Sequence, residues 1–503
     1  MSRTRKFFYN SSTTAFNQIA MMIAGLIIPR IMLKYYGSEI NGLVSSITQF
    51  LVALNLVEAG LSGAATYALY KPLADNDHHA INGVVSAARK FYLQAAYIFV
   101  SLTIGLAVFY PVFVKIESLR PLNIAFLILI MGTNGALEFL TLAKYRVLLT
   151  ADQKTYVISM ASVLHIFIST LIIVILGSMQ VNIAILRLAA LLSIFLRSLV
   201  LMLYVKRKYQ YINYKETPNT SALSKRWDAF FFQANVAITQ GAPVVLLTLV
   251  VRNLMIVSVY TIFNMVLSSI NGMLSIFKSG LPASFGDVIA KGEINVLQKS
   301  YREFEFSYYA LITIFYSITL VMIIPFIRIY TSEVTDIQYD VPLIGVLFVA
   351  SGLLYNLRTP QGMLVVSAGM YRETRLQTII QIVILIILGI VLTPFMGIYG
   401  VLLAAIISEI YRDIDWMIFV PRHITHLPIR DSAKRMLFVL VGIAIIWLPF
   451  NYIHLAPQNY LYWAVDAIAV GVYACAVVIA MSLIFERKVF REVVYRIVRM
   501  VKK

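Results

Sequence analysis

Charged residues are scarce in this chain. Only 13% of its 503 residues are Asp, Glu, Lys or Arg, and 60% are hydrophobic. A soluble chain has roughly 25% charged and 45–50% apolar residues. The composition therefore excludes a soluble multidomain enzyme and indicates an integral membrane protein.

Cysteine is almost absent, and the usual catalytic signatures are missing. The single cysteine, Cys475, lies in an apolar run, so neither a disulfide framework nor a cysteine metal site is available. The sequence has no Walker A motif, no HExxH and no nucleophile elbow. We therefore expect no enzyme activity, no metal site and no cofactor, and any transport is not driven directly by ATP bound to this chain.

Long apolar runs predict an all-α polytopic membrane protein. A membrane-spanning helix needs about 20 apolar residues, and the chain has runs of that length between polar breaks. Fourteen transmembrane helices are predicted, near residues 12–33, 41–68, 91–114, 122–143, 155–178, 183–205, 228–251, 254–277, 304–329, 341–366, 375–395, 397–420, 435–453 and 461–485.

The basic residues are distributed unevenly between the two predicted sides of the membrane. Thirty-two lysines and arginines fall in or at the edge of alternate connections and the termini, and only five fall in the other connections. Because lysine and arginine concentrate on the cytoplasmic side, both termini are predicted to be cytoplasmic. The net charge of +18 is dispersed between apolar runs, so nucleic acid is not an expected partner.

The polar segment 207–227 divides the helices into two groups. It predicts an N-terminal six-helix lobe over 1–206 and a C-terminal six-helix lobe over 228–420. A further helix pair is predicted over 435–485.

A weak internal repeat supports this division. The helix pairs that begin near Asn17 and Asn235 have similar layouts at an offset of 218 residues, with Pro29 and Pro243 at nearly matching depths. Prolines that bend equivalent helices of two repeats often mark a transport pathway, although a long membrane helix also tolerates a proline.

The predicted cytoplasmic tail, 486–503, has an amphipathic pattern. One helical stripe is apolar and the rest is mostly basic, which is typical of a helix on the surface of the inner leaflet, where anionic lipids strengthen binding. Binding to a partner protein is the alternative. The stripe consists of Phe485, Val489, Phe490, Val493, Ile497 and Val501.

Ionisable residues inside the predicted spans are the main candidates for function. Each would cost about 2.5–3.5 kcal/mol at the centre of a lipid-exposed helix, so most are expected to face a protein interior or a polar cavity. Arg197 and Arg358 lie deep and require an anionic partner, whereas Glu409 is close enough to Arg412 and Asp413 for a local ion pair. The full set is Arg30, Glu58, Glu138, Arg187, Arg197, Arg358, Glu409, Arg412, Asp413, Asp415 and Asp466.

Three segments resemble one transporter family. The segment IIPRIMLKYYGSEINGLVSSITQFLVALNLVEAGLSGAATYALYKPLADND of the first two helices resembles the start of Wzx-type bacterial polysaccharide flippases. These belong to the multidrug/oligosaccharidyl-lipid/polysaccharide (MOP) exporter superfamily. SAGMYRETRLQTIIQ and PFMGIYGVLLAAIISE resemble its second half.

The resemblance implies two six-helix lobes around a central cavity, with the terminal helix pair outside them. It implies flipping of oligosaccharide repeat units linked to a polyprenyl (undecaprenyl) diphosphate across the bacterial cell (inner) membrane by alternating access. Capsule, O-antigen or a similar surface polymer would be the product. The expected partners are this lipid-linked substrate, membrane lipids, and the polysaccharide polymerase and chain-length machinery.

Roles for five residues follow as hypotheses. Arginine binds phosphate oxygens bidentately, so Arg197 and Arg358 are assigned to the diphosphate and Arg30 to a position near the outer exit. Glu58 or Glu409 is assigned to gating or to a coupling H⁺ or Na⁺.

Two other functions stay open. A multidrug or cation antiporter of the same superfamily would use membrane carboxylates such as Glu58, Glu138 or Glu409. A membrane polymerase or ligase would need a larger outer loop than this chain has. The lipid II flippase of the superfamily carries several arginines in its first two helices, whereas only Arg30 lies there in this chain. This difference disfavours lipid II itself as the substrate.

Overall fold

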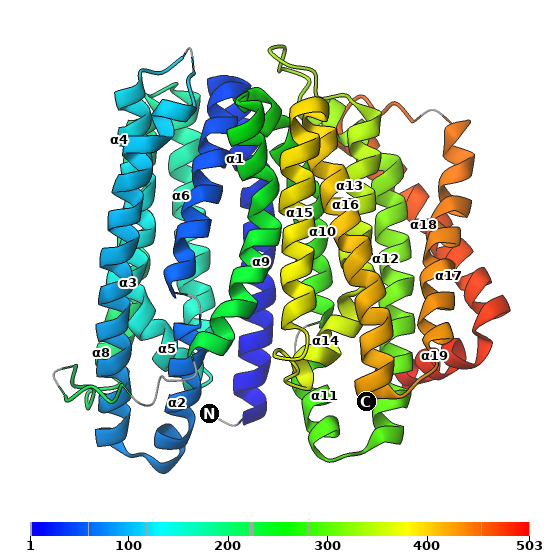
Figure 1. Ribbon diagram of the computed structural model, residues 1–503, viewed down its shortest axis with the longest axis horizontal. Coiled ribbons are helices and arrows are strands. Elements are labelled where there is room, and N and C mark those ends of the chain that lie inside the picture. The colour runs from blue at the N-terminus through cyan, green and yellow to red at the C-terminus, as the bar shows by residue number, and fades with distance from the viewer. Residues whose placement is uncertain are drawn as a thin grey trace. The chain divides into compact units, whose positions relative to one another are not determined.

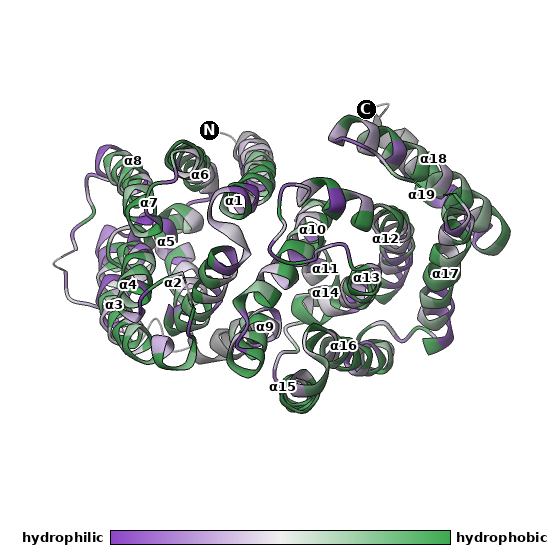
Figure 2. Ribbon diagram, turned by 90° about the horizontal axis from the view of Figure 1, so that it is seen from above, coloured by the Kyte–Doolittle hydropathy of each residue, from purple (hydrophilic) through white to green (hydrophobic). Residues whose placement is uncertain are grey.

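A computed structural model describes residues 3–58, 60–116, 118–214, 216–220, 226–278, 281–453 and 455–501. The described residues form helices joined by short connections and contain no strand. Their cores consist of side chains buried between helices, with Tyr308, Tyr316 and Phe348 among the largest fully buried ones. The helices are also hydrophobic on the outside, and Figure 2 shows α15 (Arg375–Met396) and α18 (Tyr460–Phe485) mostly green. This pattern is that of a multi-pass membrane protein.

The chain divides into two compact units, 1–261 and 262–503. The boundary lies in α10 (Leu254–Lys278), beyond the predicted linker 207–227. The start of α10 belongs to the first unit because it packs tightly against α1 (Arg3–Leu54). A Cβ at Gly42 would overlap the carbonyl oxygen of Leu254, and Nδ2 of Asn41 donates to Oγ of Ser258 at 2.7 Å.

The first unit begins with two long helices in a single run (Figure 1). Its backbone leaves helical geometry at Gly37 (φ 78°, ψ 174°), inside the predicted connection between the first two spans. The elements of this unit up to α10 are α1, η1 (Asn55–Glu58), α2 (Leu61–Asp75), α3 (His78–Phe113), α4 (Pro121–Leu137), η2 (Glu138–Leu142), α5 (Ala143–Ala151), α6 (Thr155–Ser178), α7 (Ile183–Ala190), α8 (Leu192–Lys208), α9 (Arg226–Leu246) and η4 (Leu247–Val251).

The second unit is built around its longest helix. This helix, α12 (Ile294–Tyr330), packs against α13, α17 and α18. The other elements of the unit are α11 (Leu281–Ala290), α13 (Pro342–Leu357), α14 (Thr359–Ser367), α15, α16 (Ile398–Val420), η5 (Pro421–Thr425), α17 (Ile429–Trp447), η6 (Leu448–Asn451), α18 and α19 (Arg487–Val501).

Twelve helical segments among the described residues are long and apolar enough to cross a membrane. One of them, Tyr9–Asp75, has 67 residues, which is long enough for two spans at about 20 residues each. α16 has a suitable length of 23 residues but carries four charged side chains, Glu409, Arg412, Asp413 and Asp415. The total of fourteen spans and the orientation of the termini stay predictions.

Two predicted continuous helices are interrupted. The predicted helix 41–68 breaks between Glu58 and Leu61, where Gly60 has φ 82°. The predicted helix 341–366 breaks at Arg358, between α13 and α14. The apolar run alone does not reveal these breaks, because mainly apolar residues continue on both sides of each one.

The amphipathic tail forms the predicted helix, α19, and part of its apolar face lies against protein. Phe490 and Val493 line a cavity of about 650 Å³ together with residues of α11, α12 and α18. Arg496 forms an ion pair with Glu303 of α12. The side chains of Ile497 and Val501, the end of the predicted stripe, lie outside the described residues.

Candidate functional site

The break in the second predicted span places Glu58 in irregular backbone. Glu58 ends the short 3₁₀ segment η1, and the chain resumes as α2 only after Gly60, whose positive φ favours glycine. Broken helices at membrane depth are tolerated where they are buried in protein or line a polar cavity, and transporters build binding sites from them. The side chain of Glu58 is only 15% exposed.

Arg146 of α5 joins Glu58 to a second carboxylate. Its guanidinium pairs with Glu58 and also donates to Oε1 of Glu138 at 2.9 Å. Glu138 begins the π-helical turn η2, and such wide turns are common at functional sites. The hydroxyl of Tyr92 donates to Glu58 at 3.4 Å. We call Glu58, Glu138 and Arg146 the first-unit cluster.

Arg197 of α8 lies within the electrostatic reach of this cluster. It interacts with the charges of Glu138 and Arg146, but its buried Nε has no hydrogen-bond partner among the described residues. A buried donor without a partner costs free energy. Arg197 is therefore a candidate for binding an anion from outside the chain.

Arg358 and Glu409, which the sequence analysis assigned to different ligands, form an ion pair in the second unit. Both side chains are less than a tenth exposed. Arg358 occupies the junction between α13 and α14, where Pro360, in the first turn of the new helix, has no backbone donor. The guanidinium also lies 5.1 Å from the ring centroid of Tyr355, within the range of a cation–π interaction.

Neighbouring charges on α16 complete what we call the second-unit cluster. Arg412 donates to Asp415 at 3.0 Å and to the hydroxyl of Thr378 at 2.7 Å. The local pair of Glu409 with Arg412 that the spacing suggested is therefore not formed. Asp413 is buried, and neither of its carboxylate oxygens has a hydrogen-bond partner among the described residues.

A third group of buried charges ties the terminal helices to α12. Arg435 of α17 donates to Oε2 of Glu305 at 2.8 Å and binds both carboxylate oxygens of Glu486 at 2.7 Å. Glu305 also accepts from Gln361 and from Ser432. The hydroxyl of Tyr301 donates to it as well. Because these donors all lie within the chain, this group holds helices together.

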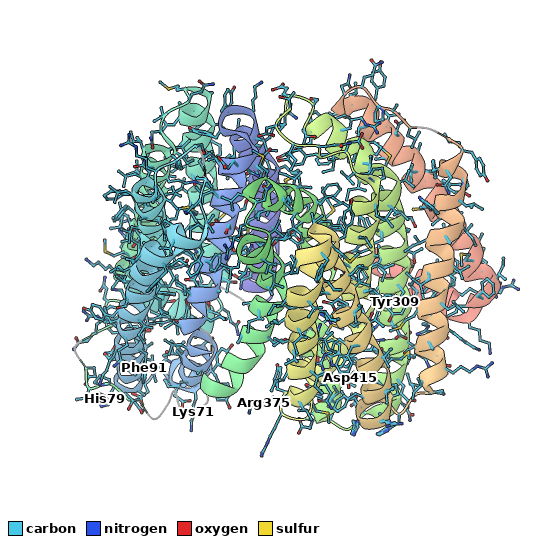
Figure 3. The ribbon with its side chains drawn as sticks, turned by 45° about the horizontal axis from the view of Figure 1, so that its top comes forward. Lys71, His79, Phe91, Tyr309, Arg375 and Asp415 are labelled. Atoms are coloured by element: carbon cyan, nitrogen blue, oxygen red, sulfur yellow. The ribbon has the colours of Figure 1, made fainter. Side chains whose placement is uncertain are left out.

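The sequence-predicted residues are thus distributed over both units. Glu58, Arg197 and the half-buried Arg30 belong to the first unit, and Arg358 and Glu409 to the second. Their assignment to the diphosphate and to a coupling ion stays a prediction. Figure 3 shows Asp415 and Arg375 toward one end of the second unit and Tyr309 farther along α12.

Sequence reasoning missed Arg146, Glu305 and Arg435. Arg146 lies in the predicted cytoplasmic connection 144–154, and Arg435, the first residue of a predicted span, is counted with the basic residues of the connection before it. Glu305 lies at the edge of a predicted span. Of the three, only Arg146 lies close in sequence to a predicted site residue that it contacts, since it follows Glu138 by eight residues, or about two helical turns.

Within each cluster, opposite charges neutralise one another, and a ligand could replace one partner of a pair. A protonated carboxylate would release its arginine, and a bound anion would release a carboxylate. Among the described residues no group of three or more His, Cys, Asp or Glu side chains is arranged to hold a metal ion.

Comparison with solved structures reveals the fold of MOP-superfamily transporters. A multidrug-resistance MATE family transporter in an inward-facing conformation is similar with a TM-score of 0.63 and 13% identity, over 86% of this chain and 98% of that one. The lipid II flippase MurJ in an inward closed conformation has a TM-score of 0.62 and 18% identity, over 96% and 99%.

A MOP-superfamily transporter from Pyrococcus furiosus has a TM-score of 0.54 and 12% identity, over 87% of this chain and 95% of that one. No family profile and no curated protein matches the sequence. At these identities the likeness establishes the fold, and these structural neighbours are transporters and a flippase rather than enzymes.

Proposed function

We propose that this protein is a flippase for lipid-linked oligosaccharides. It moves polyprenyl-diphosphate-linked repeat units from the cytoplasmic to the outer leaflet of a bacterial cell membrane by alternating access, for the synthesis of a surface polysaccharide. The observation that carries the proposal is the extent of the structural match. The structural match to the lipid II flippase covers 96% of this chain, whereas the match to the MATE transporter covers 86%.

The intramembrane arginines support an anionic substrate. A diphosphate cannot cross hydrocarbon without compensation of its charge, and the planar donor fork of arginine suits phosphate oxygens. Arg197 has a buried donor with no partner among the described residues. With the cell interior negative, outward movement of two negative charges would gain about 4.6 kcal/mol per 100 mV, at about 2.3 for each charge.

The pair of Arg358 and Glu409 supports coupling to protons. While Glu409 is ionised it neutralises Arg358, so a diphosphate competes with this carboxylate for the guanidinium. Protonation of Glu409 removes the competitor and frees Arg358. In the proposed cycle, Glu409 therefore takes up a proton as the diphosphate binds and loses it when the substrate leaves. One positive charge then moves outward with the two negative charges, and the net gain is about 2.3 kcal/mol per 100 mV.

The test is the sidedness of lipid-linked oligosaccharide in membrane vesicles, with an impermeant reagent that modifies only exposed sugars. We expect depletion of the protein to leave the substrate on the inner leaflet. Unchanged sidedness together with altered efflux of a cationic dye would instead support a drug antiporter, whose carboxylates would exchange ions for a cation.

Variants then locate the substrate site. Arg197→Gln, and the double variant R358Q/E409Q, are expected to lower flipping about tenfold or more, because each lost charge-assisted hydrogen bond contributes about 1.5–3 kcal/mol. The double variant removes both charges of its pair, so its fold is preserved better than that of Arg358→Gln alone. Arg328→Gln is the control, since Arg328 is 54% exposed and pairs with Asp340 at the surface. Normal flipping by the double variant would exclude Arg358 as a diphosphate ligand.

A further inference from the structure

The segment after α8 is fastened to the start of α3 in the first unit. The side-chain amide of Asn82 donates to the carbonyl oxygen of Tyr211 and accepts from the backbone N–H of Asn213, both at 3.0 Å. The backbone N–H of Asn219 donates to the carbonyl oxygen of Gly83, also at 3.0 Å. These bonds hold the next residue, the half-buried Tyr214, at a defined position beside α3.

Two cations converge on the ring of Tyr214. The ammonium of Lys144 lies 5.3 Å from its centroid, and the guanidinium carbon of Arg89 lies 5.9 Å from it. Lys144 also lies 5.0 Å from the ring of Tyr145. The two cations come from helices distant in sequence, α5 and α3, and they repel one another.

No carboxylate compensates this repulsion among the residues that the structure describes. Neither Arg89 nor Lys144 forms an ion pair with a described residue. The nearby Glu216 has its carboxylate 3.0 Å from Nδ1 of His79. Figure 3 shows His79 and Phe91 toward the same end of the first unit, the end that the distribution of basic residues predicts to be cytoplasmic.

A neutral donor accompanies the two cations. The hydroxyl of Tyr214 is buried and has no hydrogen-bond partner among the described residues. Burial and the nearby Tyr145 raise the pKa of Tyr214 above its usual range, although Arg89 lowers it. The hydroxyl therefore keeps its proton at neutral pH and can donate it to an anion.

We propose that Arg89, Lys144 and the hydroxyl of Tyr214 form a binding site for a phosphate or diphosphate group. A phosphoryl group supplies several acceptor oxygens and the negative charge that would relieve the repulsion between the cations. Because Tyr214 belongs to the polar segment 207–227, the bound anion also clamps that segment to α3 and α5. The inference is independent of the proposed transport substrate, since phospholipids, lipid-linked diphosphates and free phosphates all carry this group.

The test measures binding of radiolabelled inorganic pyrophosphate to the full-length protein in phosphatidylcholine nanodiscs at fixed ionic strength. We expect Arg89→Gln and Lys144→Gln each to weaken binding about tenfold, and the double variant to abolish it. Tyr214→Phe keeps the ring and loses the hydroxyl, so a smaller loss of several-fold is expected. Lys144→Arg keeps the charge and should retain most of the binding.

Lys90→Gln is the matched control, because Lys90 is exposed, adjacent to Arg89 and equal to it in charge. An equal loss of binding in Lys90→Gln, or unchanged binding in the double variant, would overturn the proposal by showing only a diffuse effect of charge. Absence of pyrophosphate binding to the wild type would also overturn it.

Nanodiscs that contain phosphatidylglycerol distinguish the sources of the group. If lipid headgroups occupy the site, phosphatidylglycerol lowers the pyrophosphate affinity of the wild type. If the site takes a free or lipid-linked diphosphate, phosphatidylglycerol leaves that affinity unchanged. Both results support the site and assign its occupant. These assays do not measure flipping, so their outcome is separate from that of the proposed function.

Discussion

Arg358 and Glu409 are buried against each other in the second unit, one at the junction of two helices and the other on α16. Each would be costly in an apolar environment if the other were removed. Their pairing means that the positive charge of Arg358 is available to an anionic substrate only when Glu409 is protonated or displaced.

This relationship predicts strong coupling between the two side chains. Arg358→Gln is expected to lower the free energy of unfolding by about 3–5 kcal/mol, because it leaves a buried carboxylate without its cation. Glu409→Gln should lower the free energy of unfolding by a similar amount. The double variant R358Q/E409Q should lower it by less than the sum of the two single losses. Unfolding measured reversibly in detergent for the three variants gives the interaction free energy.

The surface pair of Arg328 and Asp340 provides the control for this cycle. Arg328 is 54% exposed, so the interaction free energy between Arg328 and Asp340, measured with the same three kinds of variant, is expected to be only about 0–1 kcal/mol. Additive losses at Arg358 and Glu409, as small as those at the surface pair, would contradict the prediction.

The first-unit cluster predicts an asymmetry between its members. Arg146→Gln removes the cation shared by Glu58 and Glu138 and should destabilise the protein more than either Glu58→Gln or Glu138→Gln. Of the two, Glu58→Gln should have the larger effect, since Glu58 is 15% exposed and Glu138 is 32% exposed. Thermal unfolding of the three purified variants checks the order. Equal melting temperatures for all three would refute the shared-cation arrangement.

The attachment of α17 and α18 to α12 depends on the shape of one guanidinium. Arg435 binds Glu486 through two nitrogens and Glu305 through a third contact. A lysine keeps the charge but cannot make this bidentate arrangement, so Arg435→Lys is expected to destabilise the protein by about 2 kcal/mol, in line with the loss of hydrogen bonds to charged groups.

The neighbouring exposed Lys434 offers a matched control. Lys434→Arg makes the reverse exchange one residue away, and its melting temperature should equal that of the wild type. If Arg435→Lys also melts like the wild type, the bidentate contact does not hold the terminal helices.

Two glycines of α1 predict opposite results for the same substitution. A Cβ at Gly42 would overlap the carbonyl oxygen of Leu254, whereas a Cβ at Gly25 has no atom within 4 Å. Gly42→Ala should therefore destabilise the protein by about 1–3 kcal/mol through overpacking. Gly25→Ala should be neutral or stabilising by about 0.4–1 kcal/mol, because alanine adopts the helical backbone at this position and has less conformational entropy than glycine in the unfolded chain. Comparable melting temperatures for the two variants would contradict close packing of α1 on α10.

Much of the membrane architecture follows from one-dimensional patterns. Apolar runs of sufficient length predict where the chain forms membrane-spanning helices, because each run must satisfy its own backbone hydrogen bonds in lipid. The first break between helices at Gly37 and the amphipathic helix α19 also follow from local composition. The intramembrane charges Glu58, Arg358 and Glu409 were identified as candidates for the same reason, since an ionised group in an apolar run requires compensation.

Pairing among those charges depended on the tertiary structure. Glu409 has Arg412 three residues away on its own helix, yet it pairs with Arg358, and Arg412 pairs with Asp415 and bonds to Thr378. Glu58 is joined to Arg146, which the distribution of basic residues placed outside the membrane. Helical spacing specifies only which neighbours along one helix are within reach. Distances between charges on different helices depend on how those helices pack, and on breaks such as those at Gly60 and Arg358, which hydrophobicity does not record.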